Sequence, residues 1–215
     1  MQSRIKDTGI ELLIVFGIGG LIGTLIAWTS NAYVSGVQFF TALRENHSIF
    51  EITLAGSQFE LTSLIFLWIA AAFVILIRRV FGVVRWHGPA DSIYHAQQSK
   101  EPLDIKHGIA STLTAFTSAA GGGSVGQYGP LVHFGATLGI VVKRFISSRL
   151  SHEVYLGCGV AAAISAGFGA PIAGIVFAHE AILRHFSVRA IAPISIASVT
   201  ASAVSQAFFS HSATF

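Results

Sequence analysis

Residues 161 to 183 read AAAISAGFGAPIAGIVFAHEAIL, two apolar stretches divided by Gly169, Ala170 and Pro171. Proline lacks a backbone N–H group and is tolerated in the first turn of a helix but not in its interior. The pattern therefore predicts that one helix ends near Gly169 and that another begins at Pro171. The second helix, Ile172 to Leu183, would be about 18 Å long, which is too short to cross a hydrocarbon core of about 30 Å.

A second break is expected at residues 121 to 130, GGGSVGQYGP, where Pro130 follows Gly129. The other apolar stretches around these breaks are mostly shorter than a bilayer span: His107 to Ala120, Leu131 to Phe145, Val154 to Phe168 and Ile191 to Phe209. Non-helical backbone is tolerated at membrane depth only where it is buried in protein or lines a cavity. A helix that begins there directs unpaired N–H groups and the positive end of its dipole into the cavity, and such ends attract anions. We therefore expect an anion site where these helices begin.

The composition is typical of a polytopic membrane protein. Of the 215 residues, 53% are hydrophobic and 11% are charged, whereas soluble domains carry about 25% charged residues. The mean hydropathy is +0.68. Two stretches, Ile10 to Trp28 and Leu61 to Val84, are long enough to span a bilayer, and Gly19 and Gly23 predict close helix packing inside the bundle. The predicted fold class is all-α, with spanning helices beside short, broken and re-entrant ones.

The placement of charge predicts the orientation. The N-terminus and the region from Arg78 to Arg85 are basic, whereas residues 44 to 60 carry three glutamates and one arginine. By the positive-inside rule, the first two lie in the cytoplasm and the third lies outside. We expect an integral multi-pass protein of the cell (inner) membrane, in contact with lipid and with a cytoplasmic N-terminus. The net charge of +3 does not indicate a nucleic-acid partner.

Other chemistries that glycine-rich or histidine-containing segments can support are not indicated. Gly121, Gly123 and Gly126 match G-x-G-x-x-G, but no Asp or Glu between Gly121 and His152 could hold a ribose. No lysine follows these glycines as a phosphate-binding loop requires. The histidines form no metal-binding motif and Cys158 is the only cysteine, so no metal or other cofactor is expected. An enzyme is not expected either, because no nucleophile and base converge; detectable turnover without anion flux would revive that alternative.

Two stretches resemble the CLC family of chloride channels and transporters. Residues 126 to 130, GQYGP, followed by LVHFGATLG, are similar to its G-[RK]-E-G-P…G-x-x-G motif, and residues 161 to 183 are similar to its AAAFNAPLAGILFxxEE segment. The resemblance implies that residues 1–215 form the N-terminal one of two inverted repeats, with the second repeat absent from this chain. It also implies a homodimer with one anion path per subunit, and chloride or a similar small inorganic anion as the solute.

A third family motif, G-S-G-I-P, supplies a serine hydroxyl to the central anion. Its counterpart here is WHGPAD, residues 86 to 91, in which Gly88 matches a glycine of the motif and His87 is at the position of the serine. Ser92 is an alternative source of the hydroxyl. We expect backbone N–H groups near the helix starts to replace the hydration shell of the anion. The predicted anion-binding residues are Gly88, Pro89, Gly126, Gln127, Tyr128, Gly129 and Pro130.

The sequence departs from the family at two carboxylates. The gating glutamate of G-[RK]-E-G-P falls on Tyr128, which is neutral at pH 7, and the internal proton-carrying glutamate falls on Ala181. Glu180 remains beside it, either as a functional carboxylate or as a partner of Arg184 on the same helix face. We therefore predict channel-like anion passage that is not coupled to protons, with Tyr128 as the gate. A proton-coupled antiporter with a displaced relay, and a non-conducting membrane interaction protein, remain as alternatives.

Overall fold

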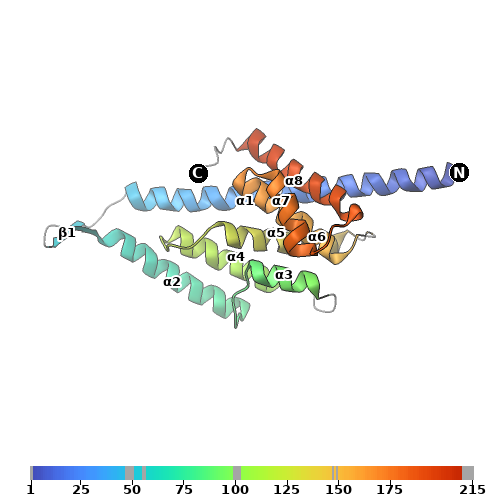
Figure 1. Ribbon diagram of the computed structural model, residues 1–215. Helices are drawn as coiled ribbons and strands as arrows, with labels where there is room; N and C mark the ends of the chain where they lie inside the picture. Colours follow the sequence, from blue (N-terminus) through green and yellow to red (C-terminus); the bar gives the residue numbers. More distant parts are fainter. Residues whose placement is uncertain are drawn as a thin grey trace.

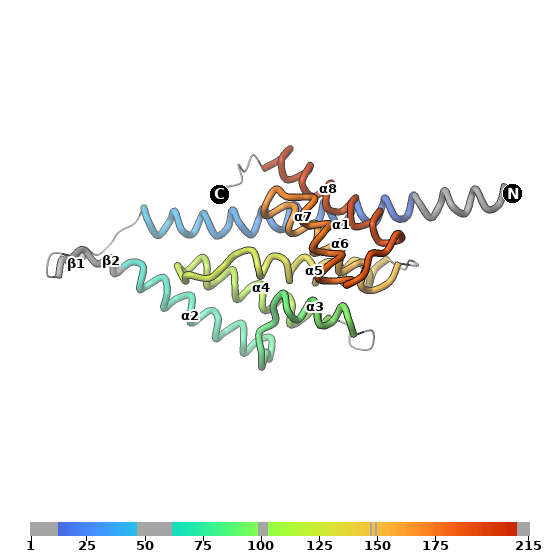
Figure 2. Tube along the Cα trace, viewed as in Figure 1, coloured from blue at the N-terminus to red at the C-terminus, as the bar shows by residue number. Residues whose placement is uncertain are grey.

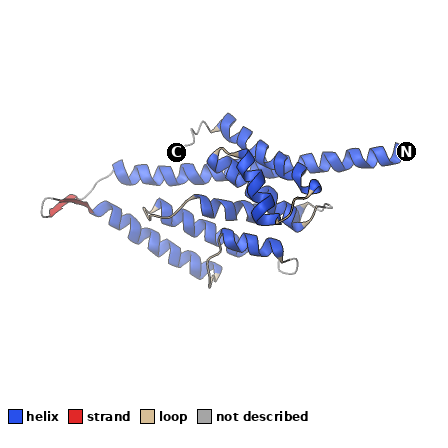
Figure 3. Cartoon of the chain, in the orientation of Figure 1, coloured by secondary structure: helices blue, strands red, loops and turns tan. Residues whose placement is uncertain are grey.

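A computed structural model describes residues 2–46, 51–54, 57–98, 103–146, 148 and 150–209. The described chain is almost entirely helical (Figure 3), which agrees with the predicted fold class. In chain order the elements are α1 (Gln2–Asn46), β1 (Glu51–Leu54), β2 (Ser57–Glu60), α2 (Leu61–Phe81), α3 (Pro89–Gln97), α4 (Ile105–Ala120), α5 (Tyr128–Phe145), α6 (His152–Phe168), α7 (Pro171–Phe177), the π-helix η1 (Ala178–Leu183) and α8 (Val188–Phe208). The two strands pair antiparallel as a small hairpin between α1 and α2 (Figure 1).

Three of these helices are long and apolar enough to cross a membrane within the described residues: Leu13–Asn46 in α1, Thr62–Phe81 in α2 and Val188–Phe208 in α8. The two expected spans are therefore present, but the first continues well past Trp28. Two of the polar residues after Trp28 are hydrogen-bonded within the bundle. Thr29 Oγ1 donates to the Leu25 carbonyl oxygen, and Asn31 Nδ2 donates to Ser205 Oγ of α8 at 3.0 Å.

Helix α6 forms the centre of the molecule and packs against α1, α5, α7 and α8. All residues from Val154 to Ser165 are buried, as expected for a helix that is apolar on every side and surrounded by other helices. Figure 2 shows α4 and α5 beside this centre and α2 at the edge of the bundle. Most of α2 is exposed, including Trp68 and Val80, so it presents a large apolar surface of the kind that contacts lipid or another protein.

Small residues bring α1 close to α8. A Cβ atom on Gly19 would lie 2.9 Å from the carbonyl oxygen of Pro193, and one on Gly23 would lie 2.5 Å from that of Ala197. Side chains at these two positions would therefore collide with backbone atoms of α8. The predicted use of Gly19 and Gly23, close packing inside the bundle, is confirmed.

Both expected helix breaks are present. Helix α6 ends at Phe168, Gly169 adopts the left-handed conformation with φ of 64°, and α7 begins at Pro171. Only a residue without a Cβ atom adopts this conformation without strain, so Gly169 reverses the chain at little cost. Helix α5 begins at Tyr128, with Pro130 in its first turn, after a non-helical connection from α4.

Candidate anion site

The first turns of α3 and α5 are in contact. Helix α3 begins at Pro89, directly after Gly88, and α5 begins at Tyr128. A Cβ atom on Gly129 would be 3.7 Å from Pro89 Cγ, so the two helix starts are in contact although about 40 residues separate them in the sequence. The positive ends of two helix dipoles therefore lie together. The sequence predicted the starts at Pro130 and Pro171 for the anion site, whereas the start that meets α5 is that of α3.

A cavity of about 240 Å³ lies at this junction, and we call it the α3–α5 cavity. The residues that line it are Trp86, His87, Gly88, Pro89, Ser111, Thr112, Thr114, Ala115, Pro130 and His133. Four of them were singled out from the sequence for anion binding: His87, Gly88, Pro89 and Pro130. The cavity is therefore built from the α2–α3 connection, α3, α4 and α5.

The start of α3 carries its own negative charge. The backbone N–H of Gly88 donates to Asp91 Oδ2 at 2.8 Å, and Arg85 Nη2 donates to Asp91 Oδ1 at 2.6 Å. The Asp91 carboxylate thus occupies the Gly88 N–H that the sequence assigned to an anion, and Arg85 offsets its charge. An anion in the cavity would have to compete with Asp91 for this donor, so other donors must contribute.

His87 is held in the wall of the α3–α5 cavity by contacts on both sides. Its backbone N–H donates to Ser111 Oγ at 2.8 Å, and its ring stacks on that of His107 with centroids 5.0 Å apart. Burial lowers the pKa of His87 below its ordinary value of 6.5. His87 is therefore neutral at pH 7 and presents a hydrogen-bonding ring to the cavity.

His133, in the second turn of α5, is fully buried and also lines the cavity. Its Nδ1 atom lies 2.7 Å from Ser92 Oγ, and Ser92 is itself fully buried. Ser92 was the rival candidate for the hydroxyl that contacts the anion. In the structure it is not among the residues that line the cavity, and its hydroxyl contacts His133 instead.

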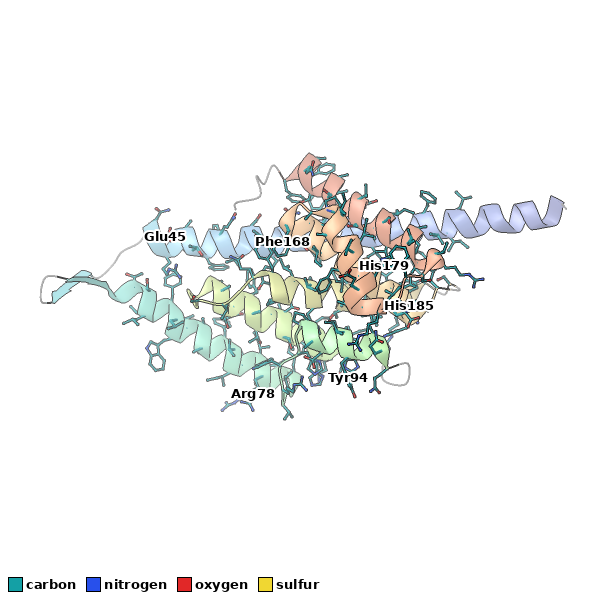
Figure 4. All side chains as sticks on the ribbon, in the orientation of Figure 1. Glu45, Arg78, Tyr94, Phe168, His179 and His185 are labelled. Atoms are coloured by element: carbon teal, nitrogen blue, oxygen red, sulfur yellow. The ribbon has the colours of Figure 1, made fainter. Side chains whose placement is uncertain are left out.

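Gln127 and Tyr128 face a second cavity, of about 120 Å³, on another side of the α5 start. Its polar lining comes from α1, α6 and α8 and includes Asn31, Ser165 and Ser205. The Tyr128 ring packs on that of Phe168, the last residue of α6, labelled in Figure 4, with centroids 4.3 Å apart. The predicted site residues are therefore divided between two cavities.

The remaining predicted residues lie outside both linings. Gly126 and Gly129 belong to the backbone around the start of α5. Glu180 is exposed on η1, and no ion pair joins it to Arg184 among the described residues. A role for Glu180 in either cavity would need a conformation different from this one.

Sequence reasoning missed Ser111 and Thr114 of α4. Both lie in an apolar helix and are three residues apart, a spacing that puts them on one face. That spacing was the available signal, since polar side chains in membrane helices mark solute pathways or helix contacts. Within the described residues, no group of three or more His, Cys, Asp or Glu side chains is arranged to hold a metal ion.

Residues 66–215 match the family of voltage gated chloride channels, which is more than half of the chain. The chain belongs to this family. The chain is 24% identical over 137 residues to the voltage-gated ClC-type chloride channel ClcB of Escherichia coli. The aligned part is 64% of this chain and 32% of ClcB.

Two solved structures share the fold of this chain. One is a CLC-type fluoride/proton antiporter, with a TM-score of 0.75 and 23% identity, and the match covers 93% of this chain and 48% of the antiporter. The other is a slow cyanobacterial Cl⁻/H⁺ antiporter, with a TM-score of 0.71, 19% identity and the same coverage. The chain thus spans about half the length of these proteins. It is an integral membrane protein of a family that transports anions.

Proposed function

We propose that this chain forms half of a pathway through which chloride or a similar small inorganic anion crosses the membrane. The observation that carries the proposal is the contact between the first turns of α3 and α5 beside the α3–α5 cavity. The α5 dipole supplies partial positive charge there, and at the start of α3 the Asp91 carboxylate is offset by Arg85. Partial charges bind an anion strongly enough for entry and weakly enough for release.

The path is channel-like and is not coupled to protons. Stoichiometric proton exchange needs carboxylates that alternate between charged and neutral forms. Tyr128 and Ala181 stand at the two positions where the family resemblance places such carboxylates. Tyr128 acts as a neutral gate beside the start of α5, and Glu180 lies exposed, away from both cavities.

A proton-coupled antiporter is the second candidate, because both solved structures with this fold are described as proton antiporters. In this chain, coupling would need a relay through other titratable groups, such as Glu180 or the histidines around the α3–α5 cavity. The two candidates differ in one measurable property, the response of the anion current to a proton gradient.

The proposal extends to the assembly and its orientation. The intact protein is a homodimer in the cell (inner) membrane, with its N-terminus in the cytoplasm and with lipid against α2. Residues 1–215 act as the N-terminal repeat, and a second repeat completes each path. The two solved structures, of which this chain covers 48%, are consistent with that division.

Anion flux from liposomes containing the intact protein tests the proposal. Chloride, nitrate, fluoride and gluconate are compared at equal concentration, with empty liposomes as the background. The proposal predicts flux of the small anions and none of gluconate, because its hydroxyl groups and carboxylate would lose their hydration in a cavity with few hydrogen-bond donors. Background flux of every anion from a protein that still dimerises would favour the non-conducting interaction protein.

A further inference from the structure

Three residues that line the α3–α5 cavity each carry a buried polar atom without a hydrogen-bond partner among the described residues. The atoms are His87 Nδ1, Thr114 Oγ1 and His133 Nε2. The residues come from three different segments, the α2–α3 connection, α4 and α5. Because an unpaired buried polar atom costs free energy, three of them at one cavity indicate a bound partner with hydrogen-bonding capacity.

The hydroxyl of Ser92 determines which nitrogen of His133 carries the proton. Ser92 Oγ is fully buried, and His133 Nδ1 is its one hydrogen-bond partner among the described side chains and backbone groups. The hydroxyl hydrogen needs an acceptor, and Nδ1 is the one within reach. Nδ1 of the neutral ring therefore accepts, and the ring proton resides on Nε2, the unpaired atom. His133 thus offers an N–H donor.

The hydroxyls of α4 add further donors. Ser111 Oγ accepts the backbone N–H of His87, and its hydrogen has no acceptor among the described residues. Thr114 Oγ1 has no partner of either kind there. The remaining walls include Pro89, Ala115 and Pro130, which present carbon atoms, and proline has no N–H group. A few donors in apolar surroundings suit a small monovalent anion that loses its hydration shell readily, and they do not suit a multiply charged one.

We propose that His133 Nε2–H, held in place by Ser92, and the Thr114 hydroxyl bind a small monovalent anion such as bromide or chloride in the α3–α5 cavity. The inference rests on the proposed function for the class of solute and extends it to two side-chain ligands. These donors compensate for the Gly88 N–H that Asp91 occupies. The binding groups are thus the side chains of α4 and α5 together with the helix starts.

Calorimetric titration of sodium bromide into the intact protein in detergent tests the role of Thr114, with sodium gluconate as the blank. Thr114→Val removes the hydroxyl and keeps the shape, and it should weaken bromide binding about tenfold, as expected for one charge-assisted hydrogen bond. Thr117→Val is the matched control. Thr117 is on the same helix, its hydroxyl is already bonded to the Leu113 carbonyl oxygen, and it does not line the cavity. Equal bromide affinities in Thr114→Val and Thr117→Val would overturn the role of Thr114.

The role of His133 can be tested by a measurement on the unmodified protein. Nitrogen-15 NMR of histidine-labelled protein should show Nε2 of His133 protonated, with its signal shifting when bromide is added. Ser92→Ala removes the hydrogen bond that selects this tautomer, so it should weaken bromide binding and give a mixture of tautomers. A His133 ring protonated on Nδ1, or one whose signals ignore bromide, would contradict the proposal.

The binding and flux measurements distinguish an error in the ligand assignment from an error in the proposed transport function. If bromide binds in the manner predicted but no anion crosses the liposome membrane, the ligand assignment stands and the transport function is wrong. If anions cross but Thr114→Val and Ser92→Ala bind bromide as the unmodified protein does, the transport function stands and the ligand assignment is wrong.

Discussion

The ring of Tyr128 packs on the ring of Phe168 with centroids 4.3 Å apart and planes inclined by 34°. Tyr128 is the first residue of α5 and Phe168 the last of α6, so this contact joins the two helix breaks. It also directs the expected gate toward the second cavity and leaves the α3–α5 cavity uncovered. Phe168 therefore holds the gate away from the proposed anion site.

Loss of this contact should reduce anion flux. A pair of packed aromatic rings contributes about 0.5–1.5 kcal/mol, so Phe168→Ala should shift the position of Tyr128 and lower flux by about two- to tenfold. The double variant Phe168→Ala/Tyr128→Ala lacks the ring that would cover the cavity and should recover the lost flux. Liposome flux of the three proteins is the measurement. A double variant no faster than Phe168→Ala would mean that Phe168 acts through packing alone.

Two glycines of α1 provide a stability test with an internal control. A Cβ atom on Gly23 would lie 2.5 Å from the Ala197 carbonyl oxygen, whereas one on Gly20 would meet nothing within 4 Å. Gly23→Ala should therefore destabilise the packing of α1 on α8 by about 1–3 kcal/mol. Gly20→Ala should leave stability unchanged or raise it slightly, because alanine favours helix. Thermal unfolding in detergent compares the two, and equal midpoints would show that α1 and α8 are not tightly packed in the membrane.

The proposed orientation can be tested at two exposed charged residues. Glu45 lies at the end of α1 from which the chain passes to α2, and Arg78 lies in the last turn of α2 (Figure 4). Cysteine at position 45 should react with an impermeant thiol reagent added outside intact cells, and cysteine at position 78 should react only after the membrane is opened. The native Cys158 is fully buried, so background labelling should be low. Reversed reactivity would place the N-terminus outside.

Helix positions were largely predictable from the sequence, because glycine and proline act on the chain locally. The breaks near Gly169 and Gly129 follow from missing Cβ atoms and N–H groups and need no knowledge of the fold. The length of α1 was not predictable in this way. Asn31 Nδ2 donates to the Ala27 carbonyl oxygen within α1 and also to Ser205 Oγ, 174 residues further along the chain, and nothing in the local sequence indicates the second partner.

The sequence and the family resemblance predicted which segments meet at the candidate site, but not the side-chain contacts between them. The approach of Gly88–Pro89 to Gly129–Pro130 was implied by the family resemblance, and the structure brings these segments together. The contact of Ser92 with His133, and the turning of Tyr128 toward Phe168, depend on how α3, α5 and α6 pack. Side-chain directions of this kind are set by tertiary structure, so a motif alone does not determine them.

Bromide binding should strengthen as the pH falls below about 6.5, the ordinary pKa of histidine. Burial lowers the pKa of His87, so this ring is neutral at pH 7 and gains its charge only in more acidic solution. A protonated His87 adds positive charge to the cavity wall and therefore favours the anion, and a bound anion favours protonation in return. The charged and titratable groups that face His87 are Arg85, Asp91, His95, His107 and His133.

The pH effect should disappear in His87→Gln, which keeps a hydrogen-bonding side chain but has no titratable proton. Calorimetric titration of bromide at pH 5.5 and pH 7.5 measures both proteins. Asp91 opposes the shift and is itself held by Arg85, so the effect is assigned to His87 only if the glutamine variant binds equally at both pH values. An unchanged pH dependence in His87→Gln would assign it to another histidine.

Anion passage should show no fixed exchange with protons. At equal anion concentrations on both sides, a proton gradient should leave the reversal potential of the intact protein at zero, because Tyr128 and Ala181 replace the carboxylates that such exchange requires. Tyr128→Glu introduces one carboxylate, with an ordinary pKa near 4.3. Its charged form should compete with the anion at the start of α5, so flux should fall at neutral pH and recover in acid. Exchange should still be absent, since Ala181 accepts no proton. A reversal potential that follows the proton gradient with a fixed ratio in the unmodified protein would show that Glu180 or a histidine carries protons, and the antiporter would then be the correct function.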